Sequence, residues 1–143
     1  MATLVIDTKE AILGRVAAYA AKQSLLGHTI RIINAEYAVV SGTRRTTLDE
    51  AKRKAAMGVP RKGPFYSKLP DRYMRRVIRG MLPYKEPRGR AAFARIICYI
   101  GTPTELKAEK AIRVPGADAT KLPNLKRVSV GQICAELGGK HYG

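Results

Sequence analysis

The sequence predicts one α/β domain, and three observations point to this class. The chain has 143 residues, of which 45% are apolar, so it is long enough to form a single core. A strand pattern, a helix pattern and a second strand pattern follow one another within about 30 residues, which favours a right-handed crossover between parallel strands. Only about three residues then separate the second strand from a third, which favours an antiparallel hairpin. A mostly parallel or mixed sheet is therefore expected.

The N-terminal part of the chain supplies the elements of this crossover. Residues 3–7 are rich in β-branched side chains and predict a strand. Apolar residues recur on one helical face over residues 12–20, and Gly27 stands where a glycine commonly ends a helix. The second and third strands are expected at residues 30–33 and 37–41.

The middle of the chain alternates helices with basic connections. Thr47 and Glu50 have the spacing of a capping box, which predicts a helix that begins near Thr47 and runs up to the next loop. That loop, residues 58–70, is expected to be a stiff, positively charged surface segment because it is rich in glycine and proline. A third helix is predicted over residues 71–82, where Pro83 ends it.

The last third of the chain is expected to be less regular. A basic turn at residues 84–90 precedes a short helical stretch at residues 91–95 and a strand at residues 96–100. Residues 101–128 contain several prolines with weak periodicity and predict an extended surface segment, and residues 129–138 predict a closing helix.

Charge is distributed unevenly along the chain. Of its 27 Lys and Arg residues, 16 lie in residues 44–95 with only four acidic residues, so this stretch carries +12 of the formal net charge of +16. Such a concentration costs self-repulsion, and a polyanionic partner is the simplest explanation for it. Nucleic acid, an acidic membrane and an acidic protein are the partners to compare.

The helix predicted near residues 72–82 has two stripes on a helical wheel. The first is apolar and is expected to face the core; it comprises Met74, Val77, Ile78, Met81 and Leu82. The opposite stripe comprises Arg72, Arg75, Arg76 and Arg79. A helix face that only meets water usually mixes acids with bases, because like charges three or four positions apart cost roughly 0.2–0.5 kcal/mol each. Only Asp71, at the start of the helix, is acidic, which favours a polyanion over water as the partner of this stripe.

The use of arginine favours nucleic acid over a membrane. A guanidinium group donates two parallel hydrogen bonds to a phosphate and stacks on unpaired bases. A membrane would accept lysine equally well and would require large apolar residues beside the charges, whereas here the apolar stripe lies opposite. The apolar runs are too short to cross a bilayer, so no membrane partner is expected. The N-terminus has no secretory signal pattern.

Evidence for catalysis or metal binding is weak. His28 and His141 stand near element or chain ends, without a nucleophile in a supporting context. Cys98 and Cys134 lie among apolar neighbours and are expected to be reduced core residues of a cytoplasmic protein. Asp7 ends the first strand, where an α/β enzyme places functional residues, but one carboxylate does not make an active site. No cofactor and no metal are therefore expected.

Two further positions stay open. Residues 41–47 join a strand to a helix N-terminus and are either a phosphate contact or an ordinary turn. Gly14 costs about 1 kcal/mol of helix propensity, so either a close packing contact or the approach of a partner is expected there. Arg15 is expected to pair with Asp7 or to reach a phosphate.

Several motifs together resemble one known family. The residues that carry the resemblance are Arg79-Gly80-Met81-Leu82-Pro83 with Lys85 and Arg88-Gly89-Arg90, Val5-Ile6-Asp7 with Leu13-Gly14-Arg15 and Ala17, and Ile33-Asn34-Ala35-Glu36 with Val39-Val40-Ser41-Gly42. They are similar to the family of the thirteenth large-subunit ribosomal protein. The loop of residues 61–66 is similar to the archaeal and eukaryotic branch. The resemblance covers roughly residues 3–100.

This resemblance implies a single ribosomal-protein domain of residues 1–143, with a three-layer α/β/α fold around a small, mostly parallel four-stranded sheet and basic loop extensions. It implies a structural, non-enzymatic constituent of the large ribosomal subunit in the cytoplasm. Its partners would be large-subunit ribosomal RNA and neighbouring ribosomal proteins, and it would support early subunit assembly. For some members the resemblance also implies repression through messenger RNA.

The expected RNA contacts are the cations of the arginine helix, of the connections on either side of it and of the preceding helix: Arg44, Arg45, Lys52, Arg53, Arg61, Lys62, Lys68, Arg72, Arg75, Arg76, Arg79, Lys85, Arg88 and Arg90. Phe65 and Tyr66 are expected either to stack on an exposed base or to pack in the core. Two rival functions remain from the sequence, namely an RNA-modifying or nucleotide-handling enzyme with a basic RNA-binding face and a chromatin-like DNA-binding protein. A cofactor loop would favour the enzyme, but the glycine-rich turns are sparse.

Overall fold

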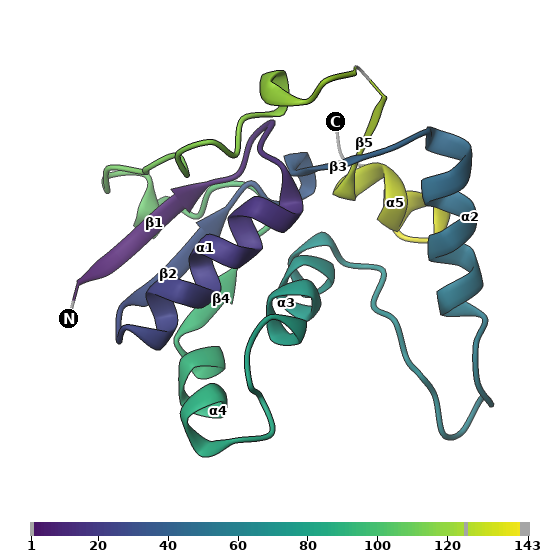
Figure 1. The fold of residues 1–143 in the computed structure, drawn as a ribbon, viewed down its shortest axis with the longest axis horizontal. Coiled ribbons are helices and arrows are strands. Elements are labelled where there is room, and N and C mark those ends of the chain that lie inside the picture. The colour runs from purple at the N-terminus through teal and green to yellow at the C-terminus, as the bar shows by residue number, and fades with distance from the viewer. Residues whose placement is uncertain (1, 125, 141–143) are drawn as a thin grey trace.

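A computed structural model of the chain describes residues 2–124 and 126–140. Helices and short strands alternate along the chain (Figure 1). In chain order the elements are β1 (Thr3–Asp7), α1 (Leu13–Leu25), β2 (Thr29–Ile33), the 3-10 helix η1 (Ala35–Tyr37), β3 (Val39–Ser41), α2 (Arg44–Ala55), α3 (Pro70–Gly80), α4 (Pro87–Ala94), β4 (Ile96–Cys98), the 3-10 helices η2 (Thr104–Leu106) and η3 (Ala119–Lys121), β5 (Arg127–Ser129) and α5 (Val130–Glu136).

The predicted crossover is present. Strands β1, β2 and β4 form a parallel sheet in the order β1-β2-β4, with Ile6 opposite Ile32 and Ile30 opposite Ile96. Helix α1 connects β1 to β2, and Gly27 adopts a φ of 104° just after the helix ends. The α/β class and the mostly parallel pairing are therefore confirmed.

The predicted hairpin between the second and third strands is wrong. Asn34 takes a left-handed conformation with a φ of 57°, and η1 then turns the chain away from β2. Strand β3 begins at Val39, two residues later than expected, and pairs antiparallel with β5, where Val40 lies opposite Val128. Instead of the single four-stranded sheet that the resemblance implies, the described residues form a three-stranded parallel sheet and a separate two-stranded pair, five strands in all.

A later segment occupies the free edge of β1. Ile112 forms an isolated parallel bridge with Ile6. The N–H of Ile112 donates to the carbonyl of Val5 at 2.8 Å, and the N–H of Asp7 donates to the carbonyl of Ile112 at 3.0 Å. The chain after β4 therefore crosses back and adds a fourth extended position beside the three parallel strands.

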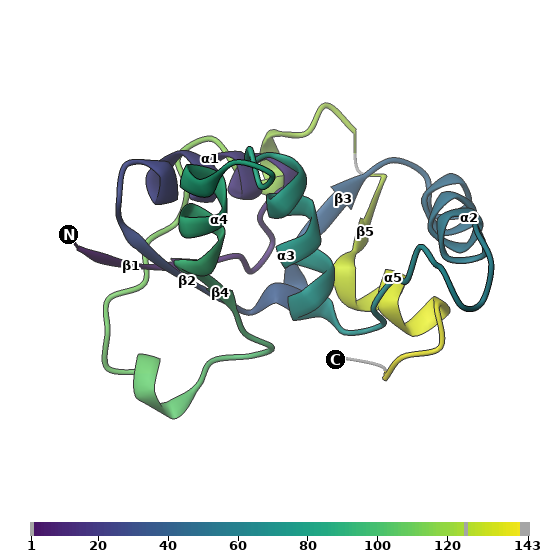
Figure 2. The same ribbon diagram turned by 90° about the horizontal axis from the view of Figure 1, so that it is seen from below.

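The core lies between the sheet and its helices. Helices α1, α3 and α4 cover one face, while the chain after β4, including η2, passes on the other side (Figure 2). Ile6, Ile30 and Ile96 from the strands are fully buried against the helices, and so are Met74 and Ile78 of α3. Among the described residues, the layer that covers this other face of the sheet is made of extended chain and 3-10 turns, whereas the resemblance implies helices on both faces.

Two helix starts differ from the prediction. Helix α2 begins at Arg44 because the Thr43 side chain, rather than that of Thr47, accepts a hydrogen bond from the backbone N–H of Thr46. Helix α4 begins at Pro87, whose fixed φ suits the first helical position, so Arg88 and Arg90 lie in a helix instead of a turn.

The C-terminal helix α5 is capped by Ser129 and Gln132, which bond each other's backbone N–H groups. It packs against η1, α3, β5 and α2, beyond the end of the parallel sheet. None of the described helices has the length and apolar character needed to cross a lipid bilayer.

Candidate nucleic-acid interface

The two stripes of α3 are present with one exception. Met74, Ile78 and Leu82 are buried and Val77 is half-buried, whereas Met81, just after the end of the helix at Gly80, is 44% exposed. On the opposite face Arg72 and Arg79 are exposed, while Arg75 and Arg76 are half-buried and have partners within the protein. The arginine face is therefore anchored at its centre and open at its ends.

Arg75 links α3 to the neighbouring strand and helix. Its Nε donates to the carbonyl of Ile96 at 3.0 Å, and its Nη2 donates to the carbonyl of Phe93 at 3.2 Å. The guanidinium group also lies 4.0 Å from the centre of the Phe93 ring. These contacts fix its position but leave its charge without a carboxylate partner among the described residues.

Arg76 holds the loop that precedes α3. Its Nη1 donates to the carbonyl of Phe65 at 2.9 Å, and its guanidinium group lies 3.9 Å from the centre of the Tyr66 ring. Tyr66 is consequently half-buried against an arginine rather than in the apolar core, whereas Phe65 is 66% exposed. Core packing, one of the two alternatives for these aromatic residues, is therefore excluded for Phe65.

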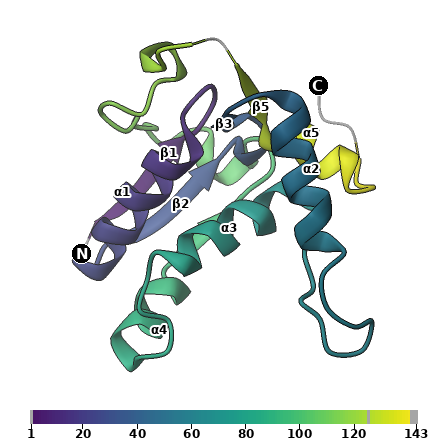
Figure 3. The same cartoon turned by 45° about the vertical axis from the view of Figure 1, so that its right-hand side comes forward.

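These side chains line a cleft with a volume of about 460 Å³. Helix α3 lies between the loop on one side and α4 on the other, and both extend in the same direction from the sheet (Figure 3). All four arginines of the face contribute to the lining, as does Tyr73 of the same helix, together with Phe65 and Tyr66 from the loop and Phe93 from α4. Burial raises the pKa of the Tyr73 hydroxyl, so it stays neutral, and no carboxylate lines the cleft.

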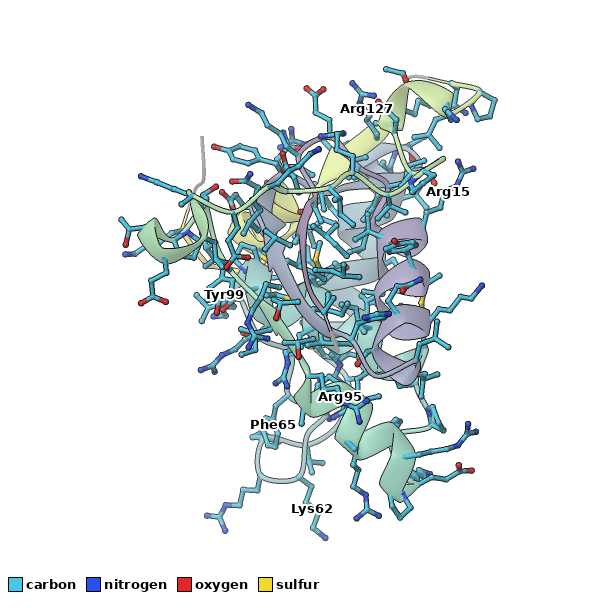
Figure 4. The ribbon with its side chains drawn as sticks, turned by 90° about the vertical axis from the view of Figure 1, so that its left-hand side faces the viewer. Arg15, Lys62, Phe65, Arg95, Tyr99 and Arg127 are labelled. Atoms are coloured by element: carbon cyan, nitrogen blue, oxygen red, sulfur yellow. The ribbon has the colours of Figure 1, made fainter. Side chains whose placement is uncertain are left out.

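The loop itself projects away from the sheet. Lys62 lies near its tip, and Phe65 lies nearer the body of the molecule (Figure 4). Arg61 and Lys62 are both exposed. Lys68, also exposed, lies beside the C-terminal segment, since a Cβ atom placed on Gly138 would be 3.2 Å from its Nζ. The loop thus presents exposed cations, while Phe65, Tyr66 and Ser67 are its residues that line the cleft.

The predicted cations of α2 are less available. Arg44 and Lys52 lie 3.6 and 3.4 Å from the carboxylate of Glu136, and Arg45 lies 4.0 Å from Asp49. Arg53 bonds Glu50 at 2.6 Å, and this hydrogen bond lowers the pKa of the Glu50 carboxyl below its ordinary value. These exposed pairs contribute little to stability, but they partly balance the charge of α2.

The cations at residues 85–90 cover the start of α4. Arg88 lies 2.9 Å from Glu86, and Arg90 donates to the carbonyl of Lys85 at 2.9 Å. The side chains of Lys85, Arg88 and Arg90 are all exposed. They form a second basic area and are not among the residues that line the cleft.

The structure therefore sorts the expected residues into groups. It brings together the four arginines of α3 with both predicted aromatic residues, and it places the α2 cations and the α4 cations on either side of them. Sequence reasoning missed Phe93 and Tyr84, which lie under Arg75 and Arg79 at 4.0 and 4.8 Å. A single aromatic residue in a short helix or turn gave no periodic signal.

The carboxyl edge of the sheet is closed by internal contacts. The Asn34 side chain donates to Asp7 at 3.0 Å, and Arg113 lies 4.0 Å from the same carboxylate. Arg15 donates to the carbonyl of Gly116 at 2.6 Å instead of pairing with Asp7, which was one of the two alternatives for it. Nothing lies within 4 Å of a Cβ atom placed on Gly14, which excludes close packing among the described residues as its role.

The cysteines and histidines fall outside any constellation. Cys98 and Cys134 are free and buried, and burial raises the pKa of Cys98 to about 12 and that of Cys134 to about 11. Within residues 2–124 and 126–140 no group of three metal-ligating acids, histidines or cysteines comes together. His141 lies outside the described residues.

A family model described as "Ribosomal protein L13" matches residues 1–105. The chain belongs to the ribosomal protein L13 family. It is 46% identical over 137 residues to the large ribosomal subunit protein uL13 of Methanosarcina barkeri, an alignment that spans 95% of this chain and 98% of the relative. It is 45% identical to that of Methanopyrus kandleri, over 94% and 86% of the two chains, and 37% identical to that of Haloarcula marismortui, over 96% and 92%.

These matches bear on two expectations. The resemblance to the thirteenth large-subunit ribosomal protein, with its archaeal-like loop, is confirmed. Membership in a family of ribosomal proteins also confirms that the L13-family chain is not an enzyme. The relatives align along almost the whole chain, and so beyond residues 3–100, which carry the motifs of the family.

Proposed function

We propose that the protein is a structural constituent of the large ribosomal subunit in the cytoplasm, that it binds large-subunit ribosomal RNA, and that it supports early assembly of the subunit. Its relatives carry the name of a large-subunit protein, which supports the location. The arginine face of α3, whose positive charge has no carboxylate partner among the described residues, supports RNA as the ligand.

The arginine face is built as a rigid binding surface. Met74 and Ile78 are fully buried behind it, so the helix cannot rotate without opening the core. Arg75 and Arg76 are held by backbone carbonyls, and therefore lose little conformational freedom when they bind a phosphate. Charge-assisted hydrogen bonds from such preorganised donors to phosphate oxygens are about twice as strong as neutral ones.

The shape of the surface suits folded RNA rather than one duplex. Specific recognition of RNA rests on shape, on the ribose 2′-hydroxyl and on unpaired nucleotides, since the A-form major groove is too narrow for side chains to read. The projecting loop with Arg61 and Lys62 and the basic start of α4 with Lys85, Arg88 and Arg90 lie on either side of α3. They would follow phosphates of neighbouring RNA segments.

Sedimentation tests the proposed location. An affinity-tagged full-length chain expressed in a host that lacks its own copy should co-sediment with the large subunit in stoichiometric amounts through a low-salt sucrose gradient. A substoichiometric signal, or a signal that stays at the top of the gradient, would argue against a structural constituent. Competition between structured RNA and duplex DNA separates the proposal from a DNA-binding protein.

Depletion tests the proposed assembly role. Cells that lose the protein should accumulate large-subunit precursors lacking several later proteins, because an early component supports the binding of others. Accumulation of otherwise complete subunits that lack only this protein would instead indicate late addition. Neighbouring ribosomal proteins are expected partners in the same particles, whereas no feature of the described residues supports a role with messenger RNA.

A further inference from the structure

The cleft beside α3 has a composition that phosphate binding alone does not require. A surface that only tracks a backbone needs cations, whereas this cleft combines four arginines with an aromatic ring that is 66% exposed. Leaving most of the Phe65 side chain in water forgoes most of the stabilisation that its burial would contribute. The ring is rigid, lines the cleft and is mostly exposed, so it offers a stacking surface.

The second feature is the unused donor capacity inside the cleft. A guanidinium group has five N–H donors. Arg75 uses two of them on backbone carbonyls and Arg76 uses one, so three and four remain. Both groups lie over aromatic rings, those of Phe93 and Tyr66, and both line the cleft. Arg72 and Arg79 add exposed guanidinium groups to its lining.

The size of the cleft limits its occupant. A volume of about 460 Å³ lies within the range of roughly 300–1,000 Å³ typical of small-ligand pockets. That space suits a base with its sugar and phosphate but not a paired helix. A planar, negatively charged ligand is therefore favoured, and a carboxylate-rich peptide would leave the ring of Phe65 uncovered.

We propose that the cleft binds one unpaired nucleotide of RNA, with its base stacked on Phe65 and its phosphate held by Arg72 and Arg79. This inference rests on the proposed function, since it takes RNA as the partner. The half-buried Arg75 and Arg76 donate to the base edge and sugar from the floor. The protein then distinguishes a bulged or looped strand from a continuous duplex of equal charge.

A fluorescent base tests this directly. The probes are two RNA hairpins of equal length, one with a single bulged 2-aminopurine and one with 2-aminopurine in a pair. The wild-type full-length chain should quench the bulged probe and bind it more tightly than the paired one. Phe65→Ala should remove the quenching and weaken binding of the bulged hairpin by about 5- to 150-fold, the range for one base–aromatic stack. It should leave affinity for the paired hairpin unchanged.

Matched variants separate stacking from charge and from folding. Phe65→Trp should retain the quenching and Phe65→Leu should lose it, because leucine keeps apolar surface without a π face. Arg72→Gln and Arg79→Gln should weaken the bulged complex more than Lys107→Gln, which removes an exposed charge from the chain after β4. Circular dichroism of each variant should match the wild type, since these side chains are exposed.

The outcomes distinguish the two proposals. Salt-dependent binding of both hairpins with equal affinity, and no effect of Phe65→Ala, would overturn the nucleotide site and leave ribosomal RNA binding intact. Failure to bind either hairpin or large-subunit RNA would overturn both. Quenching by free adenosine monophosphate as strong as that by the bulged hairpin would show a free-nucleotide site and would also overturn the inference.

Discussion

The guanidinium group of Arg76 lies 3.9 Å from the centre of the Tyr66 ring while it donates to the carbonyl of the adjacent Phe65. One side chain thus ties the end of the loop to α3 by a stacked contact and a hydrogen bond. The same charge faces the cleft. A residue expected to bind RNA therefore also determines where the loop lies.

Changing Arg76 should loosen the loop. Arg76→Gln removes a cation–π contact worth about 0.5–2 kcal/mol, so amide hydrogen exchange in residues 60–67 should accelerate by roughly 2- to 30-fold. Mass spectrometry of exchanged peptides measures this. Arg76→Lys, which keeps the charge but not the planar fork, should accelerate exchange less than the glutamine variant, because an ammonium group can still lie over the Tyr66 ring. Arg72→Gln is the control and should leave the loop unchanged; acceleration there as well would contradict this account.

Arg75 should be partly structural. Arg75→Gln removes the two hydrogen bonds to Ile96 and Phe93 and should lower the free energy of unfolding by about 1–3 kcal/mol. Urea titration measures the change. Arg79→Gln removes an exposed charge and should stay within about 0.5 kcal/mol of the wild type. Equal stability of the two variants would mean that the hydrogen bonds of Arg75 do not contribute to the stability of the fold.

RNA affinity should fall steeply with salt. If about eight phosphates are neutralised, the slope of log affinity against log salt concentration should be roughly −6 to −7. A filter-binding series with a large-subunit RNA fragment measures it. Arg61→Gln with Lys62→Gln should reduce the slope by about two, because each released contact contributes nearly one. A flat dependence would exclude phosphate contacts as the source of affinity.

Two glycines should respond oppositely to alanine. A Cβ atom on Gly89 would lie 1.9 Å from the carbonyl oxygen of Pro83, so Gly89→Ala should displace α4 and destabilise the protein by about 1–3 kcal/mol. Gly14 is helical and exposed, with nothing within 4 Å of an added Cβ. Gly14→Ala should therefore stabilise by up to about 1 kcal/mol. Thermal unfolding of the two variants measures these changes in stability. A Gly14→Ala variant less stable than the wild type would contradict the open space found around Gly14.

The cysteines should be inert in the folded protein. Burial raises their pKa values from an ordinary 9.0 to about 12 for Cys98 and about 11 for Cys134. Because the unfolded chain loses these protons first, the free energy of unfolding should be unaffected by them below pH 9 and should fall as the pH rises from 9 toward 12. A thiol reagent at pH 8 should label unfolded but not native protein. Rapid labelling of native protein would contradict the burial.

The positions of the helices and strands were easier to predict from the sequence than the pairs of helices and strands that contact one another. Periodicity gave α3 and its two faces, because a helix interacts mainly within itself. The antiparallel partner of β3 lies almost 90 residues away, and nothing in a three-residue strand specifies it. The start of α4 was missed because Pro87 suits both a turn and a first helical position.

The candidate site shows the same division. The arginine stripe was predictable because charge and spacing are local properties. That Arg75 and Arg76 would bond backbone carbonyls of Phe93 and Phe65 was not, since those contacts depend on how the loop and α4 fold back on α3. Partial neutralisation of α2 by Glu136 was equally hidden, because the carboxylate comes from α5.

In open α/β sheets, small molecules usually settle beyond the carboxyl ends of the strands. Here the chain's own later residues stand at that end: Ile112 runs beside β1, Arg113 approaches Asp7, and Thr102 donates to Asn34. The position where open α/β folds commonly bind a nucleotide is thus occupied by residues of the chain itself. Any ligand of this domain is therefore expected to bind on the outer surface of its helices and loops. The sheet then serves only as structural support.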